Sequence, residues 1–546
     1  MTSFNSPLEA FLYWEAKLPD RIFLTQPANS KLYTYTFKEV GDEVRAMASK
    51  LKSYNLPRRS HIALFSKNCA HWIMSDLAIA MSDNVSVPLY PTLNATSINQ
   101  ILVHSDSKAI IIGKLDDYES QKSGVPDIHK ISIGLYGENE GELWEDILET
   151  QVSVIETPHV NENDLHTIIY TSGTTGNPKG VMHTLRNFMI SADTFTEALK
   201  FPENMEMFSY LPLAHVAERL IAVTGIVNGA SISFTESLTT FASDLERTQP
   251  HVFFAVPRIW TKFQEKIVSS ISQKKLNIIL NIPFLNTIFI KKMKYKLGLS
   301  RAGYVCSAAA PIPSSLIHWY RKLDIKIYQG YGMTEDCCVS HFSLPNMDRI
   351  GSVGKALNGV STKLSAEGEI CIKNTCLMKG YYKEPEMTAQ VFDEEGYLKT
   401  GDVGEYDHDG YLTITGRVKD QFKTDKGKYI SPAPIELQLS KNKDIDQICI
   451  VGTGIPQPIA LITLSELGSL KSKGALSNGL IEIVNQINPD LEKHERIEKV
   501  VVMKEDWNVD NGLTTPTLKI KRNSVEKIHR KFYKSWFEMT DKVIFE

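Results

Sequence analysis

The stretch Tyr170-Thr-Ser-Gly-Thr-Thr-Gly-Asn-Pro-Lys-Gly180 decides how this sequence is interpreted. It follows the short apolar run Thr167-Ile-Ile-Tyr170, which is typical of a buried β-strand. Its three glycines let the backbone turn tightly, while Ser and Thr hydroxyls and a lysine add hydrogen-bond donors. Such a loop is suited to hold phosphate oxygens. It is not a Walker A loop, because Lys179 is followed by Gly180 rather than by Ser or Thr.

Short apolar runs alternate with amphipathic stretches from about residue 35 to residue 350. The runs expected to form buried strands are 61–65, 109–112, 167–170, 252–256 and 304–306, and residues 37–54 carry a helical pattern. Alternation of this kind predicts parallel sheets covered by helices.

The pattern changes after residue 350, where glycine and aspartate punctuate short alternating strands such as 368–372 and 410–416. This predicts a small antiparallel sheet or distorted β-barrel. We therefore predict an α/β protein with two domains. Residues 1–416 form a large N-terminal domain of stacked α/β subdomains plus the small distorted barrel, and residues 417–546 form a C-terminal α/β lid.

Composition narrows the function classes. The chain has 546 residues, 42% hydrophobic and 23% charged, which is ordinary globular usage. A net charge of −4 argues against a dedicated nucleic-acid binder, which would normally be strongly basic. The seven cysteines show no C-x-x-C spacing, so a disulfide framework or structural zinc site is not expected. This usage and the lack of a secretory signal favour a cytoplasmic location.

The most apolar stretch runs from Leu276 to Ile290, and asparagines and Pro283 interrupt it. It is too short to span a bilayer. Six lysines flank it: Lys274, Lys275, Lys291, Lys292, Lys294 and Lys296. Two interpretations stay open. The stretch is either a surface helix pair with a solvated basic end, or a patch that lies on anionic lipid at the inner face of a membrane.

The loop at 171–180 resembles the phosphate loop of the adenylate-forming superfamily, which includes acyl-CoA synthetases, luciferases and the adenylation domains of nonribosomal peptide synthetases. Four more motifs follow in the superfamily's order. Tyr328-Gln-Gly-Tyr-Gly-Met-Thr-Glu335 is similar to the adenine and magnesium motif, Thr400-Gly-Asp402 to the ribose-binding turn, Gly416-Arg-Val-Lys-Asp420 to the interdomain hinge, and Leu513-Thr-Thr-Pro-Thr-Leu-Lys-Ile-Lys-Arg522 to the segment with the mobile lysine.

Within the superfamily, the chain looks most similar to the long-chain fatty acyl-CoA synthetases. Residues 210–219, 253–260 and 422–432 resemble their aromatic/histidine motif, the strand and turn that follow it, and their lysine-rich hinge loop. The resemblance implies an ATP-dependent ligase with Mg²⁺ as cofactor and coenzyme A as co-substrate. A fatty carboxylate, expected to be long-chain, attacks the α-phosphorus of ATP to give acyl-AMP. The thiol of coenzyme A then displaces AMP.

The same resemblance implies roles for individual residues. The catalytic residues would be Lys519, Glu335, His215 and Lys179, with Glu335 and Thr174 placing Mg²⁺. The ATP-binding residues would be Thr171, Ser172, Gly173, Thr174, Thr175, Gly176, Lys179, Ala309, Gln329, Gly330, Tyr331, Gly332, Thr334, Asp402, Arg417 and Lys519. Tyr331 would stack on adenine, and Asp402 would accept hydrogen bonds from both ribose hydroxyls.

Three positions have alternatives. His215 would lie beside the acyl carboxylate, although a purely structural histidine is the competing interpretation. Lys519 would enter the site only for adenylation as the lid pivots at Lys419, but Leu518 replaces the superfamily's usual glycine, so Lys521 is a rival. Ala309 stands in a run where the family commonly has glycine.

Competing functions also remain. A fatty acyl-AMP ligase that loads a carrier protein would share every ATP-binding residue. A non-catalytic relative would be expected to lose Glu335, Asp402 or Lys519, and a generic nucleotide hydrolase is disfavoured by the lack of a Walker A pattern. The expected partners are small molecules rather than nucleic acid, and the sequence does not distinguish a monomer from a homodimer.

Overall fold

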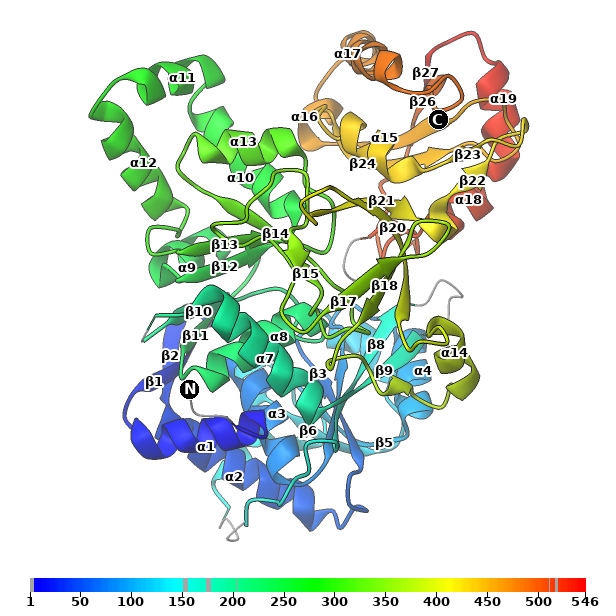
Figure 1. The fold of residues 1–546 in the computed structure, drawn as a ribbon. Coiled ribbons are helices and arrows are strands. Elements are labelled where there is room, and N and C mark those ends of the chain that lie inside the picture. The colour runs from blue at the N-terminus through cyan, green and yellow to red at the C-terminus, as the bar shows by residue number, and fades with distance from the viewer. Residues whose placement is uncertain (1–3, 151–155, 173–177, 203, 510, 516–518) are drawn as a thin grey trace.

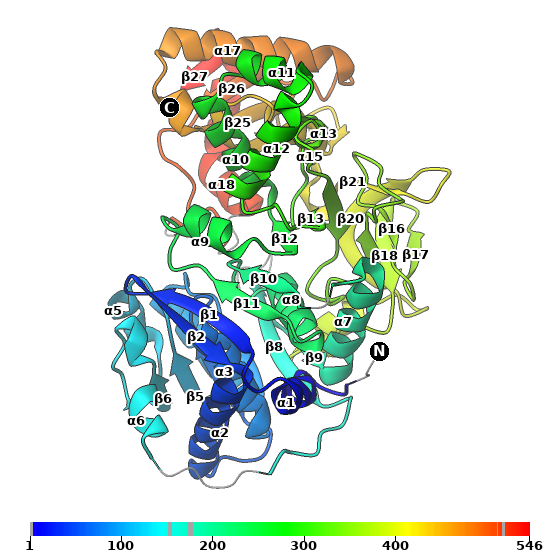
Figure 2. The same cartoon turned by 90° about the vertical axis from the view of Figure 1, so that its left-hand side faces the viewer.

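The computed structural model describes residues 4–150, 156–172, 178–202, 204–509, 511–515 and 519–546. Two large sheets with their helices form the lower and central parts of the molecule, and a small antiparallel sheet lies beside them (Figure 1). The C-terminal residues form a separate small sheet at the top of the same view. Figure 2 shows the same arrangement from the side.

One large sheet contains nine strands from the described part of the chain. In spatial order they are β16 (Lys355–Ala356), β15 (His341–Phe342), β14 (Ile327–Tyr331), β13 (Tyr304–Ser307), β12 (Val252–Ala255), β10 (Glu206–Ser209), β11 (Ser231–Phe234), β1 (Ile22–Ala28) and β2 (Lys31–Thr36). The strands from β14 to β1 run parallel, whereas β2, β15 and β16 are antiparallel edge strands.

The other large sheet has eight described strands. Their order is β19 (Gly380–Tyr381), β9 (Pro178–Thr184), β8 (Leu165–Ser172), β4 (Val85–Leu89), β3 (His61–Phe65), β5 (Ser107–Ile112), β6 (His129–Ser132) and β7 (Glu142–Leu143). The strands from β8 to β7 are parallel, while β9 and β19 pair antiparallel at one edge. The predicted buried strands and the predicted parallel sheets are thus confirmed. Antiparallel strands are added at edges of both sheets, which the sequence did not predict.

Helices follow most of the parallel strands. Their bounds are α1 (Pro7–Lys17), α2 (Phe37–Ser53), α3 (Ala70–Met81), α4 (Ala95–Ser105), α5 (Tyr118–Gln121), α6 (Trp144–Leu148), α7 (Leu185–Leu199), α8 (Val216–Val227), α9 (Phe241–Thr248), α10 (Pro257–Ser270), α11 (Gln273–Asn281), α12 (Leu285–Lys296), α13 (Ser314–Arg321) and α14 (Pro385–Val391). A capping box starts α2, because Thr36 accepts from the Glu39 amide while the Glu39 carboxylate accepts from the Thr36 amide. The predicted helix at 37–54 is therefore confirmed.

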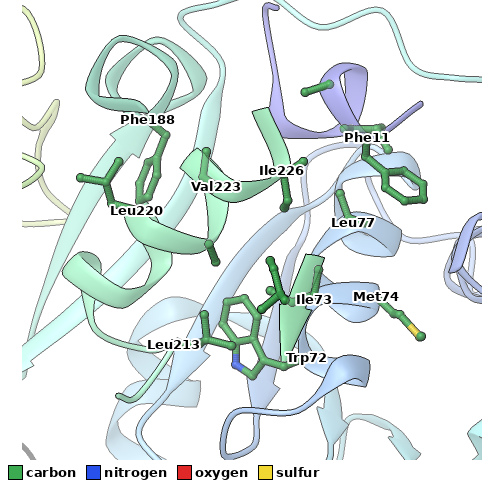
Figure 3. Close-up of a cluster of buried hydrophobic side chains, with 14 of the residues drawn as sticks. Phe11, Trp72, Ile73, Met74, Leu77, Phe188, Leu213, Leu220, Val223 and Ile226 are labelled. Carbon is green, nitrogen blue, oxygen red and sulfur yellow. The ribbon is translucent and has the colours of Figure 1, made fainter. Parts of the chain in front are cut away.

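Helices that belong to the two large sheets contribute side chains to one buried hydrophobic cluster. Leu220, Val223 and Ile226 of α8 belong to the same buried cluster as Trp72 and Ile73 of α3, and Leu220 lies beside Phe188 (Figure 3). This arrangement confirms the stacked α/β subdomains that the sequence predicts.

The predicted antiparallel unit is a four-stranded sheet in the order β17 (Ser361–Leu364), β18 (Glu369–Lys373), β20 (Leu398–Tyr406) and β21 (Leu412–Arg417). The predicted domain boundary after Gly416 falls at the end of β21. Beyond it lie β22 (Phe422–Lys423), β23 (Tyr429–Ile430), β24 (Ile445–Val451), β25 (Ile459–Leu464), β26 (Lys499–Val502) and β27 (Val543–Phe545), with α15 (Pro432–Leu439), α16 (Glu466–Ser469), α17 (Lys473–Ile487), α18 (Arg522–His529) and α19 (Tyr533–Glu538).

All seven cysteines are free thiols, and all except the partly exposed Cys338 are buried. Over the part of the chain that the structure describes, no three His, Cys, Asp or Glu residues gather as metal ligands would. No helix in that part is long and apolar enough to cross a membrane.

A buried arginine joins the two large sheets. Arg219 of α8 donates Nη2 to Asp76 Oδ1 of α3 at 2.6 Å and Nη1 to Thr167 Oγ1 of β8 at 2.5 Å. Its guanidinium also lies 5.5 Å from the ring centre of Trp72 and 5.6 Å from that of Phe188. Contacts of this geometry combine a charge-assisted hydrogen bond with cation–π attraction.

We predict that Arg219→Ala lowers the free energy of unfolding by roughly 3–5 kcal/mol, because it leaves the Asp76 carboxylate without its buried partner. Arg219→Lys should recover little, since one ammonium cannot make both forked contacts. Urea denaturation followed by circular dichroism measures the change. A loss below about 1 kcal/mol, the value of an ordinary surface pair, would contradict a joining role.

Candidate active site

The phosphate-loop motif connects two antiparallel strands. Thr171 on β8 pairs in register with Lys179 on β9, so the two ends of the loop are held side by side. Four of the predicted residues, Gly173, Thr174, Thr175 and Gly176, lie outside the described residues, and Ser172 is placed only by its backbone at the end of β8.

The motif at 328–335 leaves the nine-stranded sheet at the end of β14. Gln329 is buried and donates Nε2 to the Ser352 carbonyl at 2.8 Å, so its amide already serves the fold. At Gly332 the backbone passes close to the next turn, because a Cβ there would lie 2.7 Å from Cys338 Cα. This close approach requires glycine. The Thr334 carbonyl accepts from His183 Nε2 at 2.7 Å.

Tyr381 connects two of the predicted catalytic residues. Its hydroxyl donates to Glu335 Oε1 at 2.8 Å, and Lys179 Nζ lies 5.4 Å from the centre of its ring. The sequence pattern did not single out Tyr381, and the available signal is the Gly-Tyr-Tyr run at 380–382. The short strand β19 brings Tyr381 next to β9 and so to the phosphate loop.

Asp402 is the centre of a second group. Its Oδ1 accepts from Arg417 Nε at 2.7 Å, and its Oδ2 accepts from the Tyr331 hydroxyl at 2.8 Å. Burial, and after it the Asp402 charge, raises the pKa of the Tyr331 phenol well above its usual value, so the phenol stays a donor. Three predicted nucleotide-binding residues therefore meet within hydrogen-bonding distance.

Lys519 brings the C-terminal segment to this group. It is solvent-accessible, yet it interacts electrostatically with Arg417, Asp402 and Glu335. Surrounding protein, and then the Arg417 charge, lowers the pKa of its ammonium. Its rival Lys521 stands directly before α18, where its amide donates to the Leu513 carbonyl at 2.8 Å.

The C-terminal part touches the rest of the molecule at another point as well. Arg258 Nη2 of α10 lies 2.8 Å from Asp446 Oδ2 of β24. Lys419 lies in the short turn 418–420 that follows β21.

His215 stands at the N-terminus of α8, where its Nδ1 accepts from the Ala217 amide at 3.2 Å. Since Nδ1 accepts, the neutral ring carries its proton on Nε2. Burial, and then the positive charge of Lys519, lowers the pKa of His215 to about 4. The residue therefore caps a helix and also presents a neutral imidazole near Lys519.

Glu218, one turn further along α8, supports the loop that carries His215. Its Oε1 accepts from Ser209 Oγ at 2.6 Å and from the Tyr210 amide at 3.1 Å. Burial raises the pKa of this carboxyl to about 8. It lies inside the 210–219 motif, but no feature of the sequence distinguishes it from a solvated acid on a helix surface.

Ala309 adopts a left-handed backbone conformation with φ of +70° in the loop after β13. A side chain is disfavoured there, which explains in physical terms why glycine suits this run.

A model of AMP-binding enzymes matches residues 11–382, and one of the C-terminal domain of AMP-binding enzymes matches residues 419–538. The chain belongs to the AMP-binding enzyme family. The resemblance to the adenylate-forming superfamily is thus confirmed, with long-chain acyl-CoA synthetases among its relatives.

Among these relatives, long-chain-fatty-acid--CoA ligase 5 of Rattus norvegicus is 27% identical, and the match covers 92% of this chain and 84% of the relative. Long-chain-fatty-acid--CoA ligase FadD15 of Mycobacterium bovis is also 27% identical, over 93% of both chains. Long chain acyl-CoA synthetase 7, a peroxisomal protein of Arabidopsis thaliana, is 28% identical over 89% of this chain and 79% of its own length.

Solved structures share the fold. The adenylation domain of a carboxylate reductase from Mycobacterium chelonae superposes with a TM-score of 0.82 at 19% identity, covering 98% of this chain and 91% of that one. The anthranilate CoA ligase AuaEII gives 0.80 at 20% identity, over 97% and 98% of the two chains. The predicted fold class is therefore confirmed.

We predict that the free energy of unfolding of the Glu218→Gln variant increases, relative to that of the native protein, as pH rises. Above pH 4.5 an unfolded glutamate loses its proton, whereas the folded chain keeps it until about pH 8, so the native protein loses stability between these values. Glutamine has no proton to lose. Urea denaturation at several pH values between 5 and 9 measures the difference in unfolding free energy.

The exposed Glu394, changed to Gln, is the matched control, and its difference should stay constant with pH. If the Glu218→Gln difference is equally constant, the carboxyl is ionised in the folded protein and the assigned pKa is wrong.

Proposed function

We propose that this protein is an AMP-forming acid–thiol ligase that activates a fatty acid, long-chain in our reading, as acyl-AMP and transfers the acyl group to coenzyme A. The observation that carries the proposal is that the charges of Asp402 and Glu335 act on Lys519 of the C-terminal segment. Negative charge develops on the phosphate during such a transfer. A lysine ammonium that comes from a separate part of the chain is suited to stabilise that charge.

In this proposal the Asp402 group holds the nucleoside. Each carboxylate oxygen has two acceptor positions, so the contacts with Arg417 and Tyr331 leave one on each oxygen for a ribose hydroxyl. The Tyr331 ring supplies a flat apolar surface for adenine. Because Arg417 and Tyr331 orient the carboxylate before the ligand arrives, little reorganisation is needed on binding.

Glu335, Thr174 and Lys179 would receive the phosphates and Mg²⁺. The Tyr381 hydroxyl fixes Oε1 of Glu335, and within the described residues the other carboxylate oxygen has no hydrogen-bond partner. An oxygen ligand of this type is what Mg²⁺ prefers, and the ion would neutralise charge on the phosphates. Lys179, over the Tyr381 ring, adds a cation on the same side.

The first step needs position rather than acid–base catalysis. The fatty carboxylate is already ionised, and its oxygen bonds to the α-phosphorus as the bond to pyrophosphate breaks. The neutral His215 ring offers its Nε2 proton to the carboxylate without the cost of an imidazolium. Lys519 would hold carboxylate and phosphate oxygens together.

In the second step the thiolate of coenzyme A bonds to the acyl carbon and AMP leaves with the former carboxylate oxygen. Lys519 has no task here, so we propose that the lid turns at Lys419 and removes it. The Arg258–Asp446 contact would break in this motion. An ion pair that is largely exposed costs about 1 kcal/mol or less to separate, which suits a movement repeated in every cycle.

A cluster of aromatic rings beside the His215 loop supports a fatty substrate. Tyr210 lies 4.8 Å from Phe241 and 5.8 Å from Phe253 between ring centres, and Phe253 lies 6.3 Å from Phe263. These rings belong to the hydrophobic cluster that also contains Trp260 and Ile267 of α10. The reduced thiols suit a cytoplasmic enzyme.

ATP–pyrophosphate exchange with a panel of fatty acids, followed by thioester formation with and without coenzyme A, tests the proposal. We expect exchange that depends on an added fatty acid and on Mg²⁺, and acyl-CoA as the final product. Exchange with no acyl-CoA, but with transfer to a carrier protein, would instead identify a fatty acyl-AMP ligase. No exchange with any acid would refute the ligase.

We predict that Lys519→Ala lowers the rate of acyl-AMP formation by about 10²–10³, the usual effect of removing one charge-stabilising donor. The same variant, supplied with synthetic acyl-AMP and coenzyme A, should form thioester at nearly the native rate. Lys521→Ala is the matched control and should adenylate normally. The reverse result for the two lysines would transfer the role to Lys521, and equal loss of both steps would contradict a mobile lysine.

A further inference from the structure

The helices α11 and α12 form a hairpin that projects from the edge of the molecule (Figure 1). They are the surface helix pair expected from the sequence between residues 276 and 290. One side of the hairpin packs on the core behind α10 through Leu276, Phe289 and Met293. The hairpin is thus anchored to the body rather than loosely attached.

The opposite side and the tip expose apolar side chains. Phe284 is 85% exposed, Ile288 is 66% exposed and Ile278 is 61% exposed. Ile282 and Leu285 at the same turn are also exposed. Single exposed apolar residues are ordinary, but five within eleven consecutive positions form a patch that water solvates poorly.

The backbone at the tip is strained as well. Phe284 has φ of +65°, which a bulky side chain rarely adopts. The strain lies at a residue whose side chain is 85% exposed, so packing inside the molecule offsets little of it. A contact with a partner outside the molecule would explain why this strained conformation is kept.

Charge around the hairpin is one-sided. From Lys266 to Leu323 the sequence holds ten Lys and Arg residues and no Asp or Glu, although the whole chain carries a net charge of −4. Lys294 and Lys296 are neutralised by Asp324 and Glu246, at 2.6 and 3.1 Å. Four exposed lysines, Lys274, Lys275, Lys291 and Lys292, have no acidic partner among the described residues.

We propose that the α11–α12 hairpin binds the surface of an anionic lipid bilayer, with the tip in the apolar layer and the four lysines at the headgroups. The apolar tip matches the acyl-chain layer of such a surface, and the four lysines, which we call the basic collar, match its anionic headgroups. A nucleic acid partner would contact the lysines but would leave the apolar tip exposed to water. A second copy of the chain would bring like charges together. The interaction is separate from the proposed ligase chemistry and places the enzyme where a fatty acid partitions.

Cosedimentation with vesicles tests the proposal. We expect the native protein to sediment with vesicles of phosphatidylcholine and phosphatidylglycerol at low salt, to be released at high salt, and to ignore vesicles of pure phosphatidylcholine. Replacing Phe284 by Trp should give tryptophan fluorescence that shifts to the blue only with the anionic vesicles, which reports entry of the tip.

Paired variants separate the two contributions. The charge reversal Lys291→Glu with Lys292→Glu should weaken vesicle binding by roughly thirtyfold or more. The change Phe284→Gln with Ile288→Gln should weaken it by at least about tenfold. The control for charge is Lys493→Glu with Lys504→Glu, and the control for apolar exposure is Leu238→Gln with Leu470→Gln, at residues that are 90% and 84% exposed elsewhere. Both controls should bind like the native protein.

Thermal unfolding and ATP–pyrophosphate exchange with a short, soluble acid show whether each variant is folded. The proposal is overturned if the native protein does not sediment at low salt, if it binds neutral vesicles equally well, or if the hairpin variants bind as tightly as the controls. It is also overturned if the tip variant changes the sedimentation velocity of the protein without vesicles, because the patch would then join two copies of the chain.

Discussion

The buried carboxylate of Asp402 is the constraint on which the arrangement of the site depends. Tyr331 reaches it from the end of the nine-stranded sheet, and Arg417 reaches it from the last strand of the antiparallel sheet. Lys519 adds the C-terminal segment through its charge. Because an ionised carboxylate is costly to bury without partners, these groups must approach it, and their approach fixes where three parts of the chain meet.

Most of the framework could be predicted from the sequence because its signals are local. A strand such as β3 is a continuous apolar run because helices cover both faces of its sheet, and α2 begins where Thr36 and Glu39 form a capping box three residues apart. The antiparallel edge strands could not be predicted in this way. β2, β15 and β19 are short or half-exposed, so their direction depends on neighbours distant in sequence.

The site divides in the same manner. Lys179, Glu335 and Asp402 stand in compact motifs that a reader of the sequence can compare with a family. Tyr381 and Glu218 become visible only in three dimensions, because the first acts on a carboxylate 46 positions away and the second acts through burial. The basic collar of the hairpin shows the limit of counting charges, since six lysines in sequence become four once Asp324 and Glu246 are placed beside Lys294 and Lys296.

The distribution of thiols has a practical consequence for observing the lid. Six of the seven cysteines are buried, and Cys338 is partly exposed. Burial holds the pKa of the Cys338 thiol well above its usual value, so at neutral pH it is a poor nucleophile toward maleimides. Two new surface cysteines, one in each part of the chain, would therefore accept fluorescent dyes in the otherwise native protein. Energy transfer between the dyes would then follow the opening and closing of single molecules during turnover.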